Sequence, residues 1–171
     1  EENYLTVIEE HFIQNHGDAG ATIRFSHQTD HIPERQRKGI LLYEKYLHYY
    51  KQALAWTGYP YALYTLGSAF AVTAQAYARR GGMNRRKAGE DFYFLQTLTQ
   101  VGRVGEIVST CVHPSPRISQ RVPFGTGIAI KKWMEGSDEL FYTFDFQAFR
   151  DLKLLFSQRE KFFAGDNRDY S

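Results

Sequence analysis

Apolar residues in the first third of the chain follow two different spacings. Over residues 4–13 they recur every three or four positions, which predicts a short helix ending near residues 15–17. Residues 21–25 alternate apolar and polar side chains, the period of a half-buried strand. Helical spacing returns over residues 34–56, with basic residues between the apolar ones, and predicts a long amphipathic helix. We expect its aromatic stripe to face a core, with a membrane surface as the alternative.

Glycine and proline set the boundaries that follow. Gly58 and Pro60 end the long helix, and residues 65–72 fit a short buried strand or an extended loop. A helix is then expected from Thr73 to the pair Gly81 and Gly82, because glycine adopts the left-handed conformation that closes helices.

The remaining pattern predicts two more helices and one strand. A helix begins near Glu90 and stops before Gly102, and the valine- and isoleucine-rich residues 104–112 predict a strand. Residues 114–127 contain proline and glycine and are expected to form an irregular loop, and residues 145–163 to form a last, aromatic-rich helix. The order of elements predicts an α/β fold dominated by helices, in a single domain covering residues 1–171.

Composition favours a folded chain without a membrane span. Of 171 residues, 43% are hydrophobic and 16% aromatic, enough for a sizeable core. Residues 52–78 carry no formal charge, but their polar groups would be costly in hydrocarbon, so no transmembrane span is predicted. The formal charge of +2 gives no reason to expect a nucleic-acid partner. A single cysteine, Cys111, and the lack of an Asn-x-Ser/Thr site favour a reducing, cytoplasmic setting.

Several common enzyme motifs are absent from the sequence. It has no Walker loop, dinucleotide fingerprint, His-Glu-x-x-His or Cys-x-x-Cys motif. The six histidines show no metal-ligand spacing, and those near residues 28–31 are expected to be surface loop residues, so no zinc site is predicted.

Three short motifs stand out in the middle of the chain. They are Gly67-Ser68-Ala69-Phe70, Gly81-Gly82-Met83-Asn84 and Ala88-Gly89-Glu90-Asp91. In order and spacing they resemble the second half of a bacterial family-2 glycosyltransferase, in which a strand of small residues, a Gly-Gly turn and a Glu-Asp helix start build the acceptor side. The resemblance covers about residues 3–130, and residues 131–171 are expected to form a C-terminal helical extension.

The resemblance implies roles for the two carboxylates. Asp91 would be the general base that removes the proton from an acceptor hydroxyl, and Glu90 would orient Asp91 or bind the acceptor. A positioned base of this kind typically contributes about 10²–10⁴-fold in rate. The alternative is structural, since carboxylates are favoured in the first turn of any helix, where the helix dipole also lowers their pKa.

Further residues are candidates for substrate binding. Gly67 and Ser68 would let the backbone approach a sugar closely, although tight strand packing explains them almost as well. Arg85 and Arg86 belong to a basic cluster over residues 79–87 that could bind a diphosphate or an anionic acceptor, with a solvated surface as the alternative. The proline-rich loop adds the candidates Arg117 and Arg121.

An Asp-x-Asp motif, which in this family binds a divalent metal and the nucleotide diphosphate, is absent from the sequence. The resemblance therefore implies a partial GT-A fold that lacks the N-terminal nucleotide-binding half. The parent protein would use Mg²⁺ or Mn²⁺ and transfer sugar with inversion from a nucleotide-sugar donor to a glycan or lipid-linked acceptor, in cell-wall or polysaccharide biosynthesis. This chain alone is expected to bind no metal and to be inactive.

Two other functions stay open from the sequence. One is a non-catalytic module that binds an anionic polymer or glycan through the basic cluster over residues 79–87 and the many tyrosines. The other treats the aromatic helix at residues 34–56 as a docking face for a protein or for a membrane. The expected location is the cytoplasm, with the inner face of the membrane as a peripheral alternative.

Overall fold

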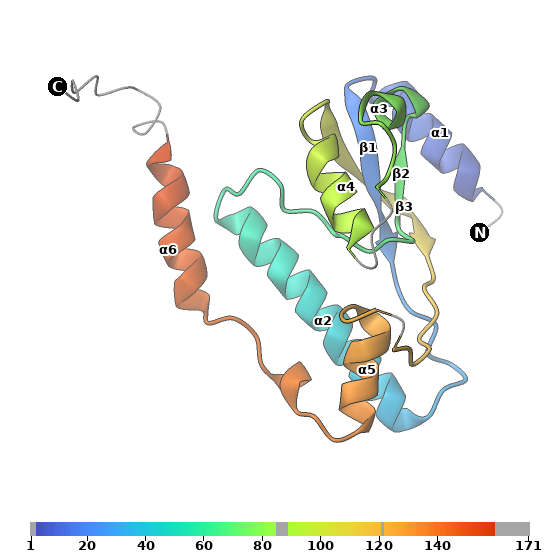
Figure 1. Ribbon diagram of the computed structural model, residues 1–171, viewed down its shortest axis with the longest axis vertical. Helices are drawn as coiled ribbons and strands as arrows, with labels where there is room; N and C mark the ends of the chain where they lie inside the picture. Colours follow the sequence, from blue (N-terminus) through green and yellow to red (C-terminus); the bar gives the residue numbers. More distant parts are fainter. Residues whose placement is uncertain (1–2, 85–88, 121, 160–171) are drawn as a thin grey trace.

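A three-stranded sheet in the order β2-β1-β3 forms the centre of the fold (Figure 1). The computed structural model describes residues 3–84, 89–120 and 122–159. The middle strand β1 (Asp18–Phe25) pairs antiparallel with β2 (Phe70–Val72) and parallel with β3 (Arg103–Val112). The strands expected over residues 21–25 and 104–112 are therefore confirmed, and the one expected within residues 65–72 occupies only the last three residues of that range.

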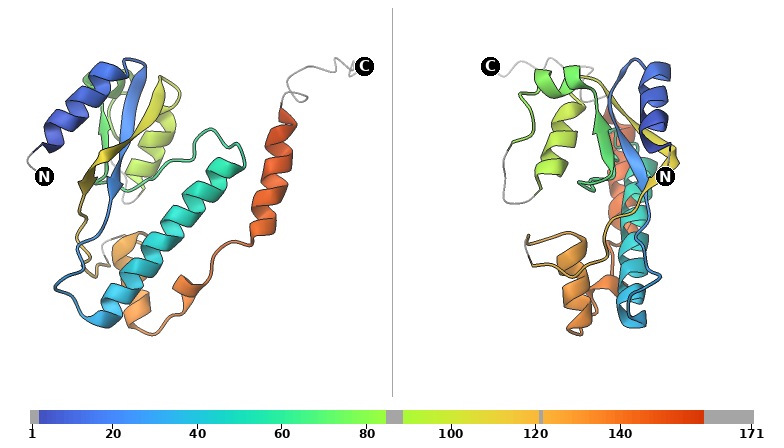
Figure 2. Two further views of the ribbon diagram at one scale, coloured as in Figure 1. Left: turned by 180° about the vertical axis from the view of Figure 1, so that it is seen from behind. Right: turned by 90° about the vertical axis from the view of Figure 1, so that its right-hand side faces the viewer.

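Helices cover both faces of this sheet. On one face α1 (Tyr4–Gln14) packs its apolar side against Ile23 and Ile107. On the other face, residues of α3 (Ala74–Arg79) and α4 (Glu90–Leu98) form a second core cluster with β1. The right-hand view of Figure 2 shows α1 and α4 on opposite sides of the strands.

Because helices cover both faces of the sheet, β1 is more buried than the sequence predicted. The alternation over residues 21–25 predicts a half-buried strand, yet every residue of β1 except Arg24 is buried. Helices on both faces leave little of the strand open to solvent, so Thr22 is buried at a position that the alternation assigned to water. The side chain of Leu98 reaches so close to Gly20 that a Cβ atom there would lie 2.6 Å from its Cδ2.

The helix boundaries around the middle motifs agree with the sequence. Thr73 is the N-cap of α3, and its hydroxyl accepts a hydrogen bond from the backbone N–H of Ala76 at 3.2 Å. After α3 both Gly81 and Gly82 have positive φ, at +70° and +79°, the conformation expected for a glycine pair that closes a helix. A helix beginning at Glu90 is likewise confirmed.

The long helix α2 (Glu34–Trp56) is the centre of a second group of helices, and its bounds match the prediction. It runs away from the sheet, and α5 (Thr126–Met134) packs along its first half, followed by the short helix η1 (Glu139–Phe141) (Figures 1 and 2). The last helix, α6 (Phe146–Ser157), lies beside the other end of α2. It begins as predicted and ends at Ser157, and residues 160–163 of the expected helix lie outside the described residues.

The helix α5 was not predicted, because proline and glycine indicated a loop up to Gly127. Gly125 occupies the N-cap position with a φ of +97°, so it starts the helix instead of interrupting it. Ile130 and Trp133 are then buried against α2, and this burial stabilises a helix that begins inside a glycine-rich stretch. The fold is thus mixed α/β and rich in helices, as expected. Within the described ranges, no helix has the length and apolar character needed to cross a membrane.

Candidate functional site

A groove of ≈ 1440 Å³ lies where α2, α4 and the end of β1 meet. The loop before β2 and the segment after β3 complete its walls. Every site candidate in the described part of the chain lines this groove, although the residues come from three separate segments. They are Gly67, Ser68, Glu90, Asp91 and Arg117.

The start of α4 places two carboxylates at the groove. Gly89 is the N-cap and has a φ of +74°, a conformation that favours glycine. A Cβ atom at Gly89 would also lie 3.1 Å from Cζ of Phe124, so this position has both a conformational and a steric reason to be glycine. Since glycine offers no side chain to cap the helix, the Asp91 carboxylate accepts a hydrogen bond from the N–H of Phe92 at 2.7 Å.

Asp91 and Gly67 lie in direct contact. A Cβ atom at Gly67 would come within 2.6 Å of Oδ2 of Asp91, so the bare backbone leaves the space that this carboxylate occupies. The N–H of Gly67 also donates a hydrogen bond toward the Asp91 carboxylate. Two of the motifs that the sequence singled out therefore meet at one carboxyl group.

Burial raises the pKa of Asp91 above its ordinary value. Hydrogen bonds from the backbone N–H groups of Phe92 and Gly67 oppose this change, and the nearby Glu90 carboxylate reinforces it. The helix-start effect, which lowers a carboxyl pKa, is therefore outweighed. Asp91 is partly buried, not the exposed residue that a solvated helix start would present, and its raised pKa makes it a stronger base.

Tyr43 of α2 faces the same carboxylate across the groove. Burial raises the pKa of the Tyr43 hydroxyl, a hydrogen bond with Thr126 opposes the shift, and the negative charge of Asp91, together with that of Tyr46 once it ionises at high pH, adds to it. The hydroxyl is therefore protonated at neutral pH and can donate a hydrogen bond. Tyr43 contributes a neutral polar group close to Asp91, and sequence analysis assigned it no role.

Behind Tyr43 a buried histidine links three elements. His27 follows β1, and its Nδ1 lies 2.7 Å from Oε1 of Glu44 on α2, which also accepts the backbone N–H of His27 at 2.6 Å. The Nε2 atom of His27 lies 3.4 Å from the hydroxyl of Thr126, the first residue of α5. We call these three residues the His27 cluster; it fixes the start of α5 beside the groove.

The sequence contains a pattern from which the inward position of His27 could have been predicted. The buried residues Ala21, Ile23 and Phe25 share odd positions, and His27 continues this parity just past the strand. A histidine at an inward position needs a hydrogen-bonding partner, which Glu44 supplies. His31, in contrast, is exposed, as expected for a surface loop residue.

Of the arginines proposed to bind substrate, Arg117 lies within the described residues. Arg117 is exposed on the wall of the groove, where its guanidinium can reach an anion. Arg85, Arg86 and Arg121 lie outside the described residues. Arg79 is exposed at the end of α3 and is not part of the groove wall, so the use of the basic cluster for an anionic polymer stays a prediction.

Metal-ligating residues do not gather in the described part of the chain, where no group of three or more His, Cys, Asp or Glu side chains could hold an ion. No protein-family model, curated protein or solved structure matches the chain.

Proposed function

We propose that this chain is the acceptor-side, catalytic-base part of a family-2 glycosyltransferase with a GT-A fold. The observation that carries the proposal is the contact between Gly67 and Asp91 at the groove. The two residues belong to different motifs. Their contact supports the view that both motifs contribute to one site. A raised pKa at Asp91 supports the same role, since it strengthens the carboxylate as a base.

In the proposed reaction an acceptor hydroxyl attacks the anomeric carbon of a nucleotide-activated sugar. Asp91 takes the hydroxyl proton as the new C–O bond forms, and the bond from the anomeric carbon to the diphosphate breaks. Direct attack from the opposite side inverts the anomeric centre. Arg117 lies on the groove wall, where it could stabilise the negative charge that develops on the diphosphate.

The donor side is proposed to lie in another part of the parent protein. That part would supply the nucleotide site and the carboxylates for Mg²⁺ or Mn²⁺, and the acceptor would be a glycan or a lipid-linked sugar. We place the parent in polysaccharide or cell-wall synthesis on the cytoplasmic side, and we expect this chain by itself to be inactive.

Substitution of the proposed base in the parent protein tests the proposal. Asp91→Asn should lower the rate of sugar transfer by about 10²- to 10⁴-fold, because the amide cannot accept the proton. Donor binding, measured by calorimetry, should stay within about twofold, since Asp91 does not hold the donor in this mechanism.

Asp145→Asn is the matched control. Asp145 is also a helix-start carboxylate, capping α6 through a 2.8 Å hydrogen bond from the N–H of Gln147, but it lies outside the groove wall. Its substitution should leave transfer unchanged. Normal turnover in Asp91→Asn, or equal losses in the two variants, would exclude the role given to Asp91.

A further inference from the structure

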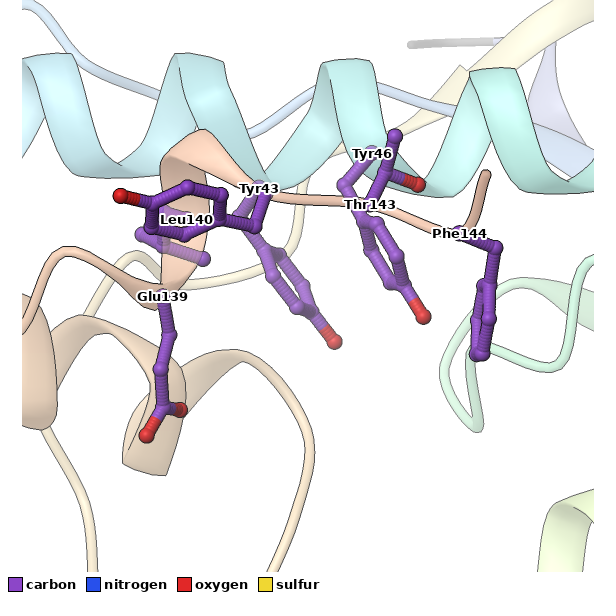
Figure 3. Close-up of a pocket in the computed structure, with 7 residues that line it drawn as sticks. Tyr43, Tyr46, Glu139, Leu140, Thr143 and Phe144 are labelled. Carbon is purple, nitrogen blue, oxygen red and sulfur yellow. The ribbon is translucent and has the colours of Figure 1, made fainter. Parts of the chain in front are cut away.

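A second, smaller pocket adjoins the groove on the far side of two tyrosines. It has a volume of ≈ 360 Å³ and is lined by residues of α2, of η1 and of the segment that follows η1. Tyr43 and Tyr46 line both the pocket and the groove, so their rings form the partition between the two spaces. Figure 3 shows these rings side by side below α2, with the ring of Phe144 next to them.

Aromatic rings make up most of the wall of this pocket. The rings of Tyr43 and Tyr46 lie 6.4 Å apart between centroids with an angle of 30° between their planes. The row continues from Tyr46 to Tyr50 at 6.1 Å and from Tyr50 to Phe144 at 5.5 Å. Phe144 is nevertheless 54% exposed and Tyr142 68% exposed, so much ring surface faces water when the pocket is empty. An occupant that covered these rings would remove this apolar surface from water.

The charges at the pocket favour a neutral occupant. Among the described residues that line it, Glu139 alone is charged, and Nζ of Lys132 lies 2.9 Å and 3.2 Å from the two Glu139 carboxylate oxygens. None of the described residues that line the pocket is a lysine or an arginine, and the nearby Lys132 is already paired with Glu139, so the wall offers a phosphate no unpaired positive partner. A quaternary ammonium group would meet the aromatic rings, but the carboxylate beside them is already paired with Lys132.

The polar groups and the size of the pocket favour a single ring over a long chain. Hydroxyl groups of Tyr43, Tyr46 and Thr143 are carried on residues of the wall, next to the aromatic surface. A pyranose ring matches such a wall, because its C–H face can pack on an aromatic ring while its hydroxyls form hydrogen bonds. The volume lies near the lower end of the range for small-molecule sites, about 300–1,000 Å³, whereas an extended acyl or prenyl chain would need a longer apolar channel.

We infer that this pocket binds one neutral sugar unit of the acceptor glycan, next to the unit that reacts at Asp91. The inference rests on the proposed function, because it takes Asp91 as the reacting base. Tyr43 lies near the Asp91 carboxylate in the groove, and it also lines the pocket. A glycan entering the pocket would therefore have its next unit in the groove, near the base. The pocket thereby selects acceptors at least two sugar units long.

The test is a binding experiment on the chain as it stands. Cellobiose, maltose, lactose and N,N′-diacetylchitobiose are titrated and followed by saturation-transfer NMR and by backbone amide shifts. At least one disaccharide should bind and shift the amides of Tyr46 and Phe144. Phe144→Ala and Phe144→Leu should each weaken that binding at least fivefold, the second because leucine keeps apolar volume but has no ring face. Tyr77→Ala, which removes an exposed tyrosine of α3 away from the pocket, should change it less than twofold.

Three outcomes would overturn the inference. The first is that none of the four disaccharides binds, and the second is that binding occurs but is insensitive to Phe144. The third is that tetramethylammonium or 1-octanol binds at the pocket while the sugars do not. Failure of the proposed function is seen separately: Asp91→Asn should leave sugar binding within twofold, whereas normal transfer by the parent carrying Asp91→Asn would contradict the proposed function alone. Circular dichroism of each variant confirms that it is folded.

Discussion

At the residue scale, Asp91 is held in a setting that disfavours its charge. Its carboxylate is partly buried between α4 and the loop that contains Gly67, and burial raises its pKa. A residue present only to support a helix start would gain from exposure to solvent and to the helix dipole. Asp91 therefore carries a cost in stability that a role in chemistry would explain.

Asp91→Asn tests this cost on the chain itself. A folded-state pKa above the ordinary value of 3.8 means that the folded protein binds the proton more tightly, so the stability contributed by this group falls as pH rises above 3.8. The variant should therefore be at least as stable as the unmodified chain at pH 7, and the difference should vanish below pH 3.8. Urea denaturation at pH 7 and pH 3 measures it. A loss of about 0.3–1 kcal/mol at pH 7 would instead indicate a structural helix-start carboxylate.

Gly67→Ala should displace the Asp91 carboxylate. The new methyl group would lie 2.6 Å from Oδ2, so the carboxylate must turn away from the loop toward solvent. Its pKa should then fall toward the ordinary value, and transfer by the parent should decrease at least tenfold. Carboxyl ¹³C NMR titration follows the pKa. Gly17→Ala is the control, because nothing lies within 4 Å of a Cβ atom there, and an unchanged Asp91 pKa in Gly67→Ala would contradict the geometry.

At the element scale, the sequence predicted those helices whose apolar period is long and whose ends carry clear signals. The bounds of α2 were predicted correctly because apolar residues keep the helical spacing throughout its 23 residues and Gly58 follows its end. The helix α5 was missed because its start lies in a glycine-rich stretch, and only packing of Trp133 on α2 makes that stretch helical. Contacts between distant segments, such as Asp91 with Gly67, follow from no local pattern, although the motif resemblance grouped these residues.

Gly39→Ala should disrupt the packing of α5 on α2. In a free helix this change stabilises by about 1 kcal/mol, since alanine has the higher helix propensity. Here a Cβ atom would lie 2.9 Å from Cγ of Trp133, and overpacking of this kind typically costs about 1–3 kcal/mol. We therefore expect net destabilisation in urea denaturation. The indole N–H signal of Trp133, which donates to the carbonyl of Arg35 at 2.6 Å, should also shift.

A double-mutant cycle separates the clash from the change in helix propensity. Trp133→Leu removes the indole ring, so Gly39→Ala should become stabilising or neutral in that background. If Gly39→Ala stabilises the unmodified chain, then α5 does not pack on α2 at this point.

At the scale of the whole molecule, the sheet and the long helix are joined by a small number of polar contacts. The His27 cluster is one of them: it connects the end of β1 with α2 and with the first residue of α5. A salt bridge of 2.7 Å between Lys51 and Glu106 connects α2 with β3. Apolar packing joins these parts as well, since Leu47 of α2 packs against the buried cluster that contains Phe25 at the end of β1. Polar and apolar contacts together therefore hold the walls of the groove in place. The sequence pattern places His27 at an inward position, but it carries no signal for which residue of α2 pairs with it.

Glu44→Gln should weaken the junction between the sheet and α2, and it should do so in a pH-dependent way. Burial alone would raise the pKa of Glu44, but its hydrogen bonds with His27 outweigh burial, so the pKa is lowered from 4.5. A lowered folded-state pKa means that the stability contributed by Glu44 is fully present above pH 4.5 and is lost as pH falls through the folded value. The variant should therefore be less stable than the unmodified chain at pH 7, and the two should converge at lower pH.

The sign of this dependence is opposite to that expected for Asp91, so the two carboxylates can be distinguished in one set of urea denaturation curves. Glu34→Gln is the matched control. Glu34 lies on the same helix, and its 3.3 Å ion pair with Arg37 is exposed to solvent. Exposed pairs contribute about 0–1 kcal/mol, so the control should show a small, nearly pH-independent change. If Glu44→Gln behaves like Glu34→Gln, then the His27 cluster does not hold the two parts together, and the Lys51–Glu106 pair and the packing of Leu47 near Phe25 must do so instead.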